Sequence, residues 1–565
     1  MGARGARGAR GARGRAPRAP AAAAALAALT ALVALAGRAG RAAGAGAARG
    51  GWAGGAREHC GGVPVFDARA FGARGDGVHE DGAAVQAAID AAAAARVPGA
   101  CAVVQAGVFL VGGLLLQPEV TLVVDQSAIL RASTEGAAYL PQFGRAPANS
   151  PGNADCVAGA LVGAAGAHNA RIVGGGVLDA QAPQYYTGVG VHKTAGEDAG
   201  YLPDQLTFRP LAVPKHGDVR VKVLSVSHSE NVTVAGVTLS DGHGWTTRFV
   251  NCTNLLVSHV DVFGDWRMPN NDGLDPNSCT NVTFEHVDVN VADDAISPKA
   301  TLKLPDGGYL PMRGLTVRHA RLRSRSFAVK LGTEIYGDME DLLFEDLRVY
   351  SSHEGLGIDL RERGDVRNVT FRRVNIDRAY WAGSGGFARQ NWMGNAQPIF
   401  VSNGKAFGPV RPRGTISGVL FEDVTAVGEN GVYVSGLPAA PGMERGSIHD
   451  VVFRDVRVLV QQLPRNNATN GPHPAHSDRQ ESAAAGGAGG EPVDAFFVEH
   501  ATGVAFEGAC AAAFAGRPKP GNAFGACARF GAGAGGPAPR LATCVPPARP
   551  GPPPGAPGRP AEPRP

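Results

Sequence analysis

The sequence predicts an all-β fold, a right-handed parallel β-helix with a short capping helix near its N-terminal end. Three observations predict it. A unit made of a turn residue followed by alternating Val, Thr and Phe recurs along the chain, the unit returns every twenty to thirty residues, and no helical periodicity interrupts it. These features fit a solenoid of stacked coils better than a two-layer sheet.

The recurring turn residue defines the repeat. Its steps along the chain are 23, 27, 33, 27, 27, 50, 32 and 53 residues, and two of these are double steps. The positions are Asn231, Asn254, Asn281, Gly314, Asp341, Asn368, Gly418, Asp450 and Gly503. Because a single coil cannot bury its own apolar side chains, coils stack at about 4.8 Å and equivalent residues form ladders. We expect one ladder of Asn side chains, serving the turns.

The N-terminal part of the solenoid begins with a strand over 63–71 and a turn over 72–77. Asp81 then opens a helix that runs to Ala95 and covers the open end of the stack, whose strand edges would otherwise invite aggregation. Short strands follow over 101–130, and the regular part starts at Ile172. The long insertions 183–215 and 377–412 are expected to build a binding face.

The predicted domains are a leader over 1–50, a catalytic β-helix over 59–530 and a disordered Gly/Pro/Ala-rich tail over 531–565. The leader resembles a secretory signal, with an Arg-rich start, an apolar stretch over 21–36 and small residues over 43–48. An uncleaved membrane anchor is the alternative, although about 16 apolar residues are few for a membrane span. We expect a secreted, extracellular protein of the cell wall.

Charge and cysteine content agree with secretion. The leader carries nine Arg and no acid, so its removal changes the net charge from +4 to −5, which argues against a nucleic-acid partner. Eight cysteines suit an oxidising compartment. Cys252 and Cys279, one coil apart, form either a disulfide or a buried reduced pair. Cys510, Cys527 and Cys544 are expected to form disulfides that close loops at the C-terminal end. Asn467 is the most accessible glycosylation sequon.

Two acidic motifs, Asn271-Asp272-Gly273 and Asp293-Asp294, stand one repeat apart. Stacking would bring these carboxylates to one cleft, where an acid and a water-activating base can hydrolyse a glycosidic bond with inversion across about 6.5–9.5 Å. Crowding should also raise the pKa of one carboxyl. The alternative is that these residues only form turns.

The same residues resemble glycoside hydrolase family 28, the polygalacturonase group. The resemblance rests on Val65 to Asp76, on Asn271 to Pro276, on Asp293 to Lys299, and on the 21 residues that separate Asp272 from Asp293. It implies a secreted, inverting β-helix enzyme with no metal and no cofactor. In it Asp293 is the general acid, Asp272 and Asp294 hold and deprotonate the water, and Asn271 and Lys299 contact the substrate.

The downstream half departs from that group. Ser324 to Lys330 stand where it has Gly-His-Gly, and Asp359-Leu360-Arg361 replace its Arg-Ile-Lys clamp, so an Asp would repel a uronic acid. The chain resembles instead a divergent branch of the family. There Lys330, Glu334, His353 and Arg361 would line subsites and Trp392 would stack on a sugar. The alternatives are surface charge for Lys330 and Arg361, a turn for His353 and core packing for Trp392.

Three functions from different classes fit these residues. The first is an inverting glycoside hydrolase, acting as a monomer on a cell-wall or extracellular polysaccharide, with no nucleic-acid partner and no stable membrane partner. The second is a polysaccharide lyase, which needs an Arg or Lys base and usually calcium. The third is an inactive carbohydrate-binding or structural β-helix.

Overall fold

The computed structural model describes residues 56–146, 157–185, 211–379, 396–403, 414–438, 446–461, 493–515, 524–530 and 543–545. All of them belong to one compact unit, Gly51–Pro565. The leader, most of the two insertions, Asn467 and Trp392 lie outside these ranges. So does the predicted disordered tail 531–565, except for Thr543–Val545, which form a strand. No helix within them is long and apolar enough to cross a membrane.

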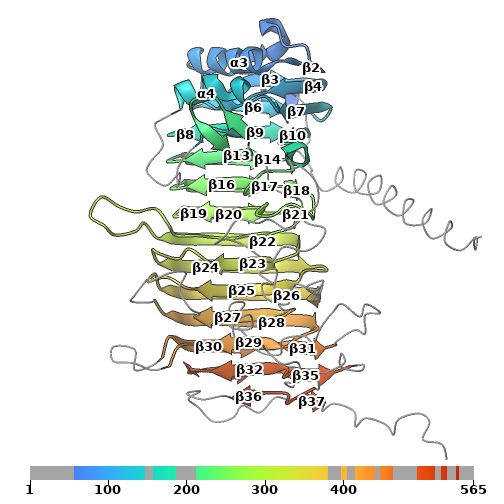
Figure 1. Ribbon diagram of the computed structural model, residues 1–565, viewed down its shortest axis with the longest axis vertical. Coiled ribbons are helices and arrows are strands. Elements are labelled where there is room, and N and C mark those ends of the chain that lie inside the picture. Colours follow the sequence, from blue (N-terminus) through green and yellow to red (C-terminus); the bar gives the residue numbers. More distant parts are fainter. Residues whose placement is uncertain are drawn as a thin grey trace, which may run out of the picture. The chain divides into compact units, whose positions relative to one another are not determined.

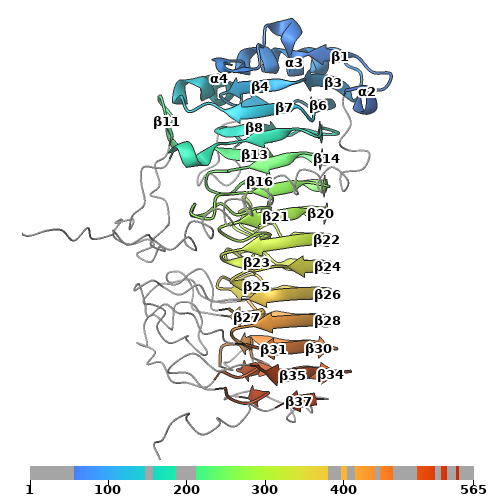
Figure 2. The same ribbon diagram turned by 90° about the vertical axis from the view of Figure 1, so that its right-hand side faces the viewer.

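The fold is the predicted right-handed parallel β-helix. The coils contribute strands to three parallel rows, and successive coils stack in register (Figures 1 and 2).

The first row opens each coil. It holds β1 Val65–Asp67, β3 Ala100–Val104, β6 Val120–Val124, β9 Arg171–Gly174, β14 Glu230–Ala235, β17 Thr253–Ser258 and β20 Thr280–Glu285. It continues through the first halves of β22 Met312–Ser324, β24 Met339–Val349, β26 Val366–Ala379 and β28 Ile416–Gly428, then β30 Ile448–Arg454, β33 Ala501–Thr502 and β34 Ala505–Glu507.

The second row follows after a bend. It holds β2 Asp76–Glu80, β4 Gly107–Val111, β7 Ala128–Ala132, β10 Val177–Asp179, β15 Thr238–Ser240, β18 Asp261–Phe263 and β21 Asp288–Val291. The second halves of β22 to β28 extend it, followed by β31 Arg457–Val460, β35 Ala511–Phe514 and β37 Thr543–Val545.

The third row completes each coil. It holds β5 Leu114–Leu115, β8 Ala160–Ala165, β13 Lys222–Ser227, β16 Thr247–Val250 and β19 Pro276–Asn277, then β23 Phe327–Gly332, β25 Glu354–Leu360, β27 Ile399–Asn403, β29 Val432–Ser435, β32 Phe496–Glu499 and β36 Arg529–Phe530. Single bridges from Leu274 to Ile296 and from Ile296 to Val329 join its two parts.

The predicted turn residues share one backbone conformation. All nine have positive φ, between 54° at Asn231 and 64° at Gly314, a region that only Gly, Asn and Asp adopt at low cost. The Asn side chains form the expected ladder, because Asn254 donates to Asn231 at 3.0 Å and Asn281 donates to Asn254 at 2.6 Å. The repeat is therefore a repeat of left-handed turns.

Inward-facing side chains of the first row fill the lumen. Phe344, Phe371, Phe421 and Phe453 stack coil upon coil with ring centroids 4.8, 5.0 and 5.2 Å apart. Each of these rings is almost fully buried. The "aromatic or Val" position of the repeat is thus the core position that fixes the register of the coils.

The capping helix forms as predicted, as α3 Gly82–Ala94. Asp81 precedes it without capping it, since its carboxylate accepts from the backbone N–H groups of Arg74 and Gly75 at 2.8 and 2.9 Å and so ties the preceding turn to the helix. The predicted first strand is shorter than 63–71, because Asp67 ends it by accepting from Arg69 N and starts the 3₁₀ helix η2 Ala68–Phe71.

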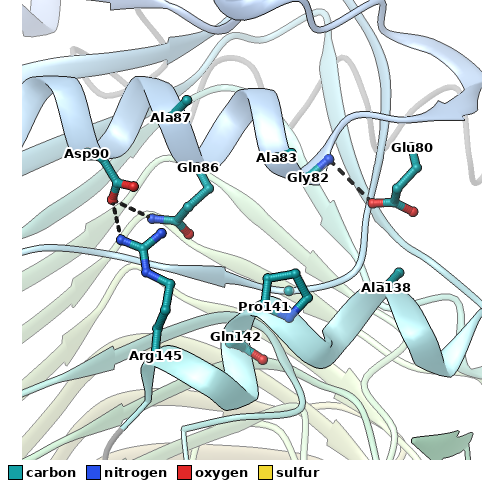
Figure 3. A pocket seen from close by; sticks show the side chains of 11 residues that line it. Glu80, Gly82, Ala83, Gln86, Ala87, Asp90, Ala138, Pro141, Gln142 and Arg145 are labelled. Carbon is teal, nitrogen blue, oxygen red and sulfur yellow. Dashed lines mark hydrogen bonds and ion pairs between the residues drawn. The ribbon is translucent and has the colours of Figure 1, made fainter. Parts of the chain in front are cut away.

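The remaining elements lie at the N-terminal part of the stack. They are α2 Ala56–His59, η3 Gly136–Tyr139, α4 Leu140–Arg145, η4 Ala182–Tyr185 and an antiparallel pair, β11 Leu211–Val213 and β12 Gly217–Val219. A cavity of about 360 Å³ separates α3 from α4 (Figure 3). Its polar side chains bind one another or the backbone, as in the ion pair from Arg145 to Asp90 at 2.7 Å and the bond from Gln86 to Asp90 at 3.0 Å.

Cysteine chemistry differs in part from expectation. A disulfide joins Cys60 to Cys101 and ties the N-terminal segment to β3. Cys252 and Cys279 are the buried reduced pair, the second of the two alternatives. Cys527 is disulfide-bonded, whereas Cys510 is a buried free thiol and not part of a disulfide. The Cys60–Cys101 bridge was not foreseen, because 41 residues separate its ends and no motif marks them.

Candidate active site

The acidic motifs lie where the second row turns into the third. The loop after β18 carries Asp272, and the short loop after β21 carries Asp293 and Asp294 on the next coil. Backbone bonds stack the two loops, with Gly273 N donating to Asp294 O at 2.9 Å and Leu274 N donating to Ala295 O at 3.0 Å. The prediction that coil stacking brings the motifs together is confirmed.

The three carboxylates form one buried cluster. One oxygen from each of Asp272, Asp293 and Asp294 lies within 4.8 Å of the other two, and the residues are 4, 5 and 2% exposed. These oxygen distances are shorter than the about 6.5–9.5 Å between carboxyl groups expected for inversion. Stacked coils are only about 4.8 Å apart, so side chains on adjacent coils must approach this closely.

Asn271 supports the loop that carries Asp293 and Asp294. Its side-chain oxygen accepts from the N–H groups of Ala292 and Asp293 at 2.9 and 3.0 Å, and its amide nitrogen donates to Asp265 O at 3.1 Å. The residue is fully buried, so it has no surface for the substrate contact that we expected. It instead fixes the loop that presents Asp293.

The three carboxylates have different partners. Asp293 accepts from Asp294 N at 2.9 Å, and Asn270 donates to it at 3.4 Å. Asp294 accepts from Phe327 N at 3.1 Å and from Lys330 Nζ at 3.0 Å. Asp272 Oδ1 is buried without a hydrogen-bond partner in the part of the chain that the structure describes.

Burial and crowding favour a proton in the cluster. Burial, followed by the nearby Asp293, Asp275 and Asp294 carboxylates, raises the pKa of Asp272 well above its usual value, against the opposing effect of Lys299. Burial likewise raises the pKa of Asp275. The cluster therefore combines two carboxyl groups whose pKa burial raises, Asp272 and Asp275, with a third, Asp294, whose two oxygens each accept from a donor.

Lys299 borders the same cluster. Burial lowers the pKa of its ammonium, but Glu334, Asp275, Asp272 and Asp294 outweigh burial and raise the pKa overall. Lys299 Nζ lies 3.6 Å from Glu334 and 3.2 Å from Ser297 Oγ. Glu334 is 43% exposed in its side chain, so it remains accessible to a substrate, as predicted for a subsite residue.

Trp245 and Arg248 are neighbours of the site that were not predicted as site residues. The Trp245 ring lies 4.7 Å from the Arg248 guanidinium and 5.1 Å from Lys299 Nζ. Its φ of 61° is unusual for a bulky residue, and such strain is most often found at functional positions. A large aromatic residue directly after Gly244, one coil before Asn271, was the available signal.

His353 and Arg361 do not line an open subsite. Both are 1% exposed, and Arg361 Nε donates to Asp359 at 2.9 Å in a buried ion pair. Neither side chain has exposed surface in this structure, so their expected contact with substrate stays a prediction. Lys330, in contrast, belongs to the cluster, and Trp392 lies outside the described residues.

A cation could bind at the cluster. Among the described residues, Asp272, Asp293 and Asp294 are the one group with acidic, His or Cys ligand atoms close enough to hold a metal ion. Lys330 already supplies a positive charge to Asp294, which weakens the attraction for a second cation.

Comparison with known families and proteins gives one consistent result. The family model "Glycosyl hydrolases family 28" matches residues 152–304, the segment that contains both acidic motifs. A protein of Vitis vinifera named "Probable polygalacturonase" is 25% identical over 387 residues, which cover 66% of this chain and 70% of that protein.

Solved structures share the fold. The family 28 exopolygalacturonase of Yersinia enterocolitica matches with a TM-score of 0.56 and 17% identity, over 85% of this chain and 78% of that one. The hyperthermoactive exopolygalacturonase of Thermotoga maritima matches with a TM-score of 0.53 and 19% identity, over 71% and 88% of the two chains.

Proposed function

We propose that this chain, which matches the family 28 glycoside hydrolase model over residues 152–304 and is similar to a probable polygalacturonase, hydrolyses glycosidic bonds of a pectin-like cell-wall polysaccharide with inversion at the anomeric carbon. The observation that carries the proposal is the buried cluster of Asp272, Asp293 and Asp294, bordered by Lys299 and Lys330. The proposal has two parts, a pectin-degrading glycosidase activity and inversion as its stereochemical course.

The proposed reaction uses one proton and one water. Asp293 donates its proton to the glycosidic oxygen as the bond from the anomeric carbon to that oxygen breaks. A water between Asp272 and Asp294 attacks the same carbon from the opposite face and gives a proton to a carboxylate, so the cluster ends with the proton it began with. The resemblance to the family, and not the oxygen distances, supports inversion.

A uronic acid is an acceptable substrate residue. The positively charged side chains of Arg248 and Lys299 border the cluster. Asp359, which we expected to repel a uronate, is fully buried and bound to Arg361. Its charge is therefore compensated and is not exposed to a substrate, which removes the main objection to a uronate-containing polymer.

The proposed setting is extracellular. The leader over 1–50 and the mature net charge of −5 support secretion toward a wall polysaccharide. The disulfide from Cys60 to Cys101 fits an oxidising compartment. In this setting the polysaccharide is the partner, and we propose that the protein acts as a monomer.

The test is release of reducing ends from a panel of plant and algal polysaccharides. We expect wild type to act on at least one uronate-containing polymer. Asp293→Asn should lose at least about a hundredfold in kcat, because it cannot donate the proton. Asp306→Asn, which changes an exposed acid outside the site, should match wild type. Equal rates for Asp293→Asn and wild type would contradict the proposal.

Two other outcomes separate the alternative functions. Products with the ultraviolet absorbance of an unsaturated uronate would indicate a lyase. Binding of a polysaccharide without release of reducing ends would indicate a carbohydrate-binding β-helix.

A further inference from the structure

We propose that Lys330 is a positioning residue that keeps Asp294 ionised as the water-activating base, and that it is not a sugar subsite. The inference rests on the proposed function for its kinetic consequence. The contact itself rests on geometry alone.

Lys330 and Asp294 form a buried ion pair. Lys330 Nζ lies 3.0 Å from Asp294 Oδ2, and the two side chains are 10 and 3% exposed. The other oxygen of Asp294 accepts from Phe327 N at 3.1 Å. Both oxygens of this carboxylate are thus bound by donors, which favours the anion. A side chain so buried and so engaged offers little surface to a sugar.

The fold holds Lys330 in this place. Backbone pairing fixes its strand, because Lys330 N donates to Ile296 O at 2.9 Å and Lys330 pairs with Gly357 on β25. The Phe327 ring lies 5.4 Å from Lys330 Nζ. A Cβ at Gly357 would lie 2.4 Å from that ring, so glycine is needed there for Phe327 to keep its position.

The other charged groups around Asp294 make the lysine necessary. Asp272, Asp275 and Asp293 all face the same space, and each disfavours an anion at Asp294. Lys299 is the second cation nearby, but its ammonium also contacts Glu334 and Ser297.

The charged residues on and beside the neighbouring strand β25 are buried. Glu354 pairs with Phe327 in the sheet and is fully buried, while Asp359 and Arg361 bind each other. Without Lys330, Asp294 would be a buried carboxylate among three others, and we infer that it would take up a proton at a pH where the native enzyme is active.

The kinetic test compares Lys330→Met with Lys303→Met, an exposed lysine on a loop outside the site. We expect Lys330→Met to lower kcat by about a hundredfold or more at mildly acidic pH with KM changed by less than about threefold. The acidic limb of its kcat profile should move to higher pH by about one unit or more. A raised KM with an unchanged kcat and pH profile is the signature of a subsite residue and would overturn the inference.

A second measurement does not need activity, and so separates this inference from the proposed function. Lys330→Met should lower the Tm at pH 7 and should lower it less at pH 4, where Asp294 can be protonated. The double variant Lys330→Met/Asp294→Asn should regain most of the lost Tm at pH 7, because no buried charge is left unpaired.

The comparison of the single and double variants tests the Lys330–Asp294 pair even where Lys330→Met does not fold. In that case, recovery of folding in the double variant supports the pair, and a double variant that also fails to fold overturns it. Where Lys330→Met does fold, a double variant as unstable as the sum of the two single changes overturns it. Should wild type cleave no polysaccharide while the cycle shows coupling, the proposed function fails and the Lys330–Asp294 pair stands.

Discussion

At the residue scale, one carboxylate beside the site is predicted to limit stability. Burial, followed by the nearby Asp179 charge, raises the pKa of Asp241 to about 6. An acid with a raised pKa favours the protonated fold, so this stabilisation is complete below its unfolded pKa near 4 and is lost as the pH rises through 6.

Asp241→Asn should therefore be more stable than wild type at pH 7 by about 1–3 kcal/mol and equal to it near pH 3.5. An Asn oxygen can still accept the bond from Asp265 N, which Asp241 accepts at 3.0 Å. Thermal unfolding at the two pH values measures the effect, with Asp306→Asn as the control. A gain of the same size at both pH values would show that ionisation is not its cause.

The residues of the site were predictable to different degrees. Asp272, Asp293 and Asp294 could be found because their spacing equals one coil, and stacking converts that spacing into contact. Asn271 was placed correctly at the site, but its buried side chain bonds the backbone of Ala292 and Asp293, because sequence spacing does not show whether a side chain is exposed or buried.

At the element scale, the left-handed turn ladder links the repeat to stability. Asn254 combines a φ of 56° with side-chain bonds to Asn231 and Asn281. The sequence predicted this ladder well, since Asn, Gly and Asp share a tolerance for positive φ that other residues lack. It predicted helix α3 equally well, but not that Asp81 binds Arg74 and Gly75 in place of a helix cap.

Asn254→Ala should cost about 1–2 kcal/mol, because it removes two exposed side-chain bonds and places a Cβ residue at positive φ. Asn254→Gly removes the same bonds without the backbone strain and should cost less. Denaturant unfolding of both variants measures the difference. An alanine variant that is as stable as the glycine variant would mean that backbone conformation does not select Asn here.

At the scale of the whole solenoid, function depends on coil stacking. The parallel register was predictable from periodicity, because a row of Phe and Val recurs at one position of each coil. The Cys60–Cys101 disulfide and the strained Trp245 were not, since both depend on contacts between segments that no repeat relates.

The most direct test of the account is the configuration of the first product. Stacked coils bring Asp272, Asp293 and Asp294 together. If Asp293 is the acid and the other two hold the water, as we propose, proton nuclear magnetic resonance of the anomeric protons in the first minutes of hydrolysis should show the inverted anomer before mutarotation. A product that first appears with retained configuration would contradict the assignment of Asp272 and Asp294 to a water molecule.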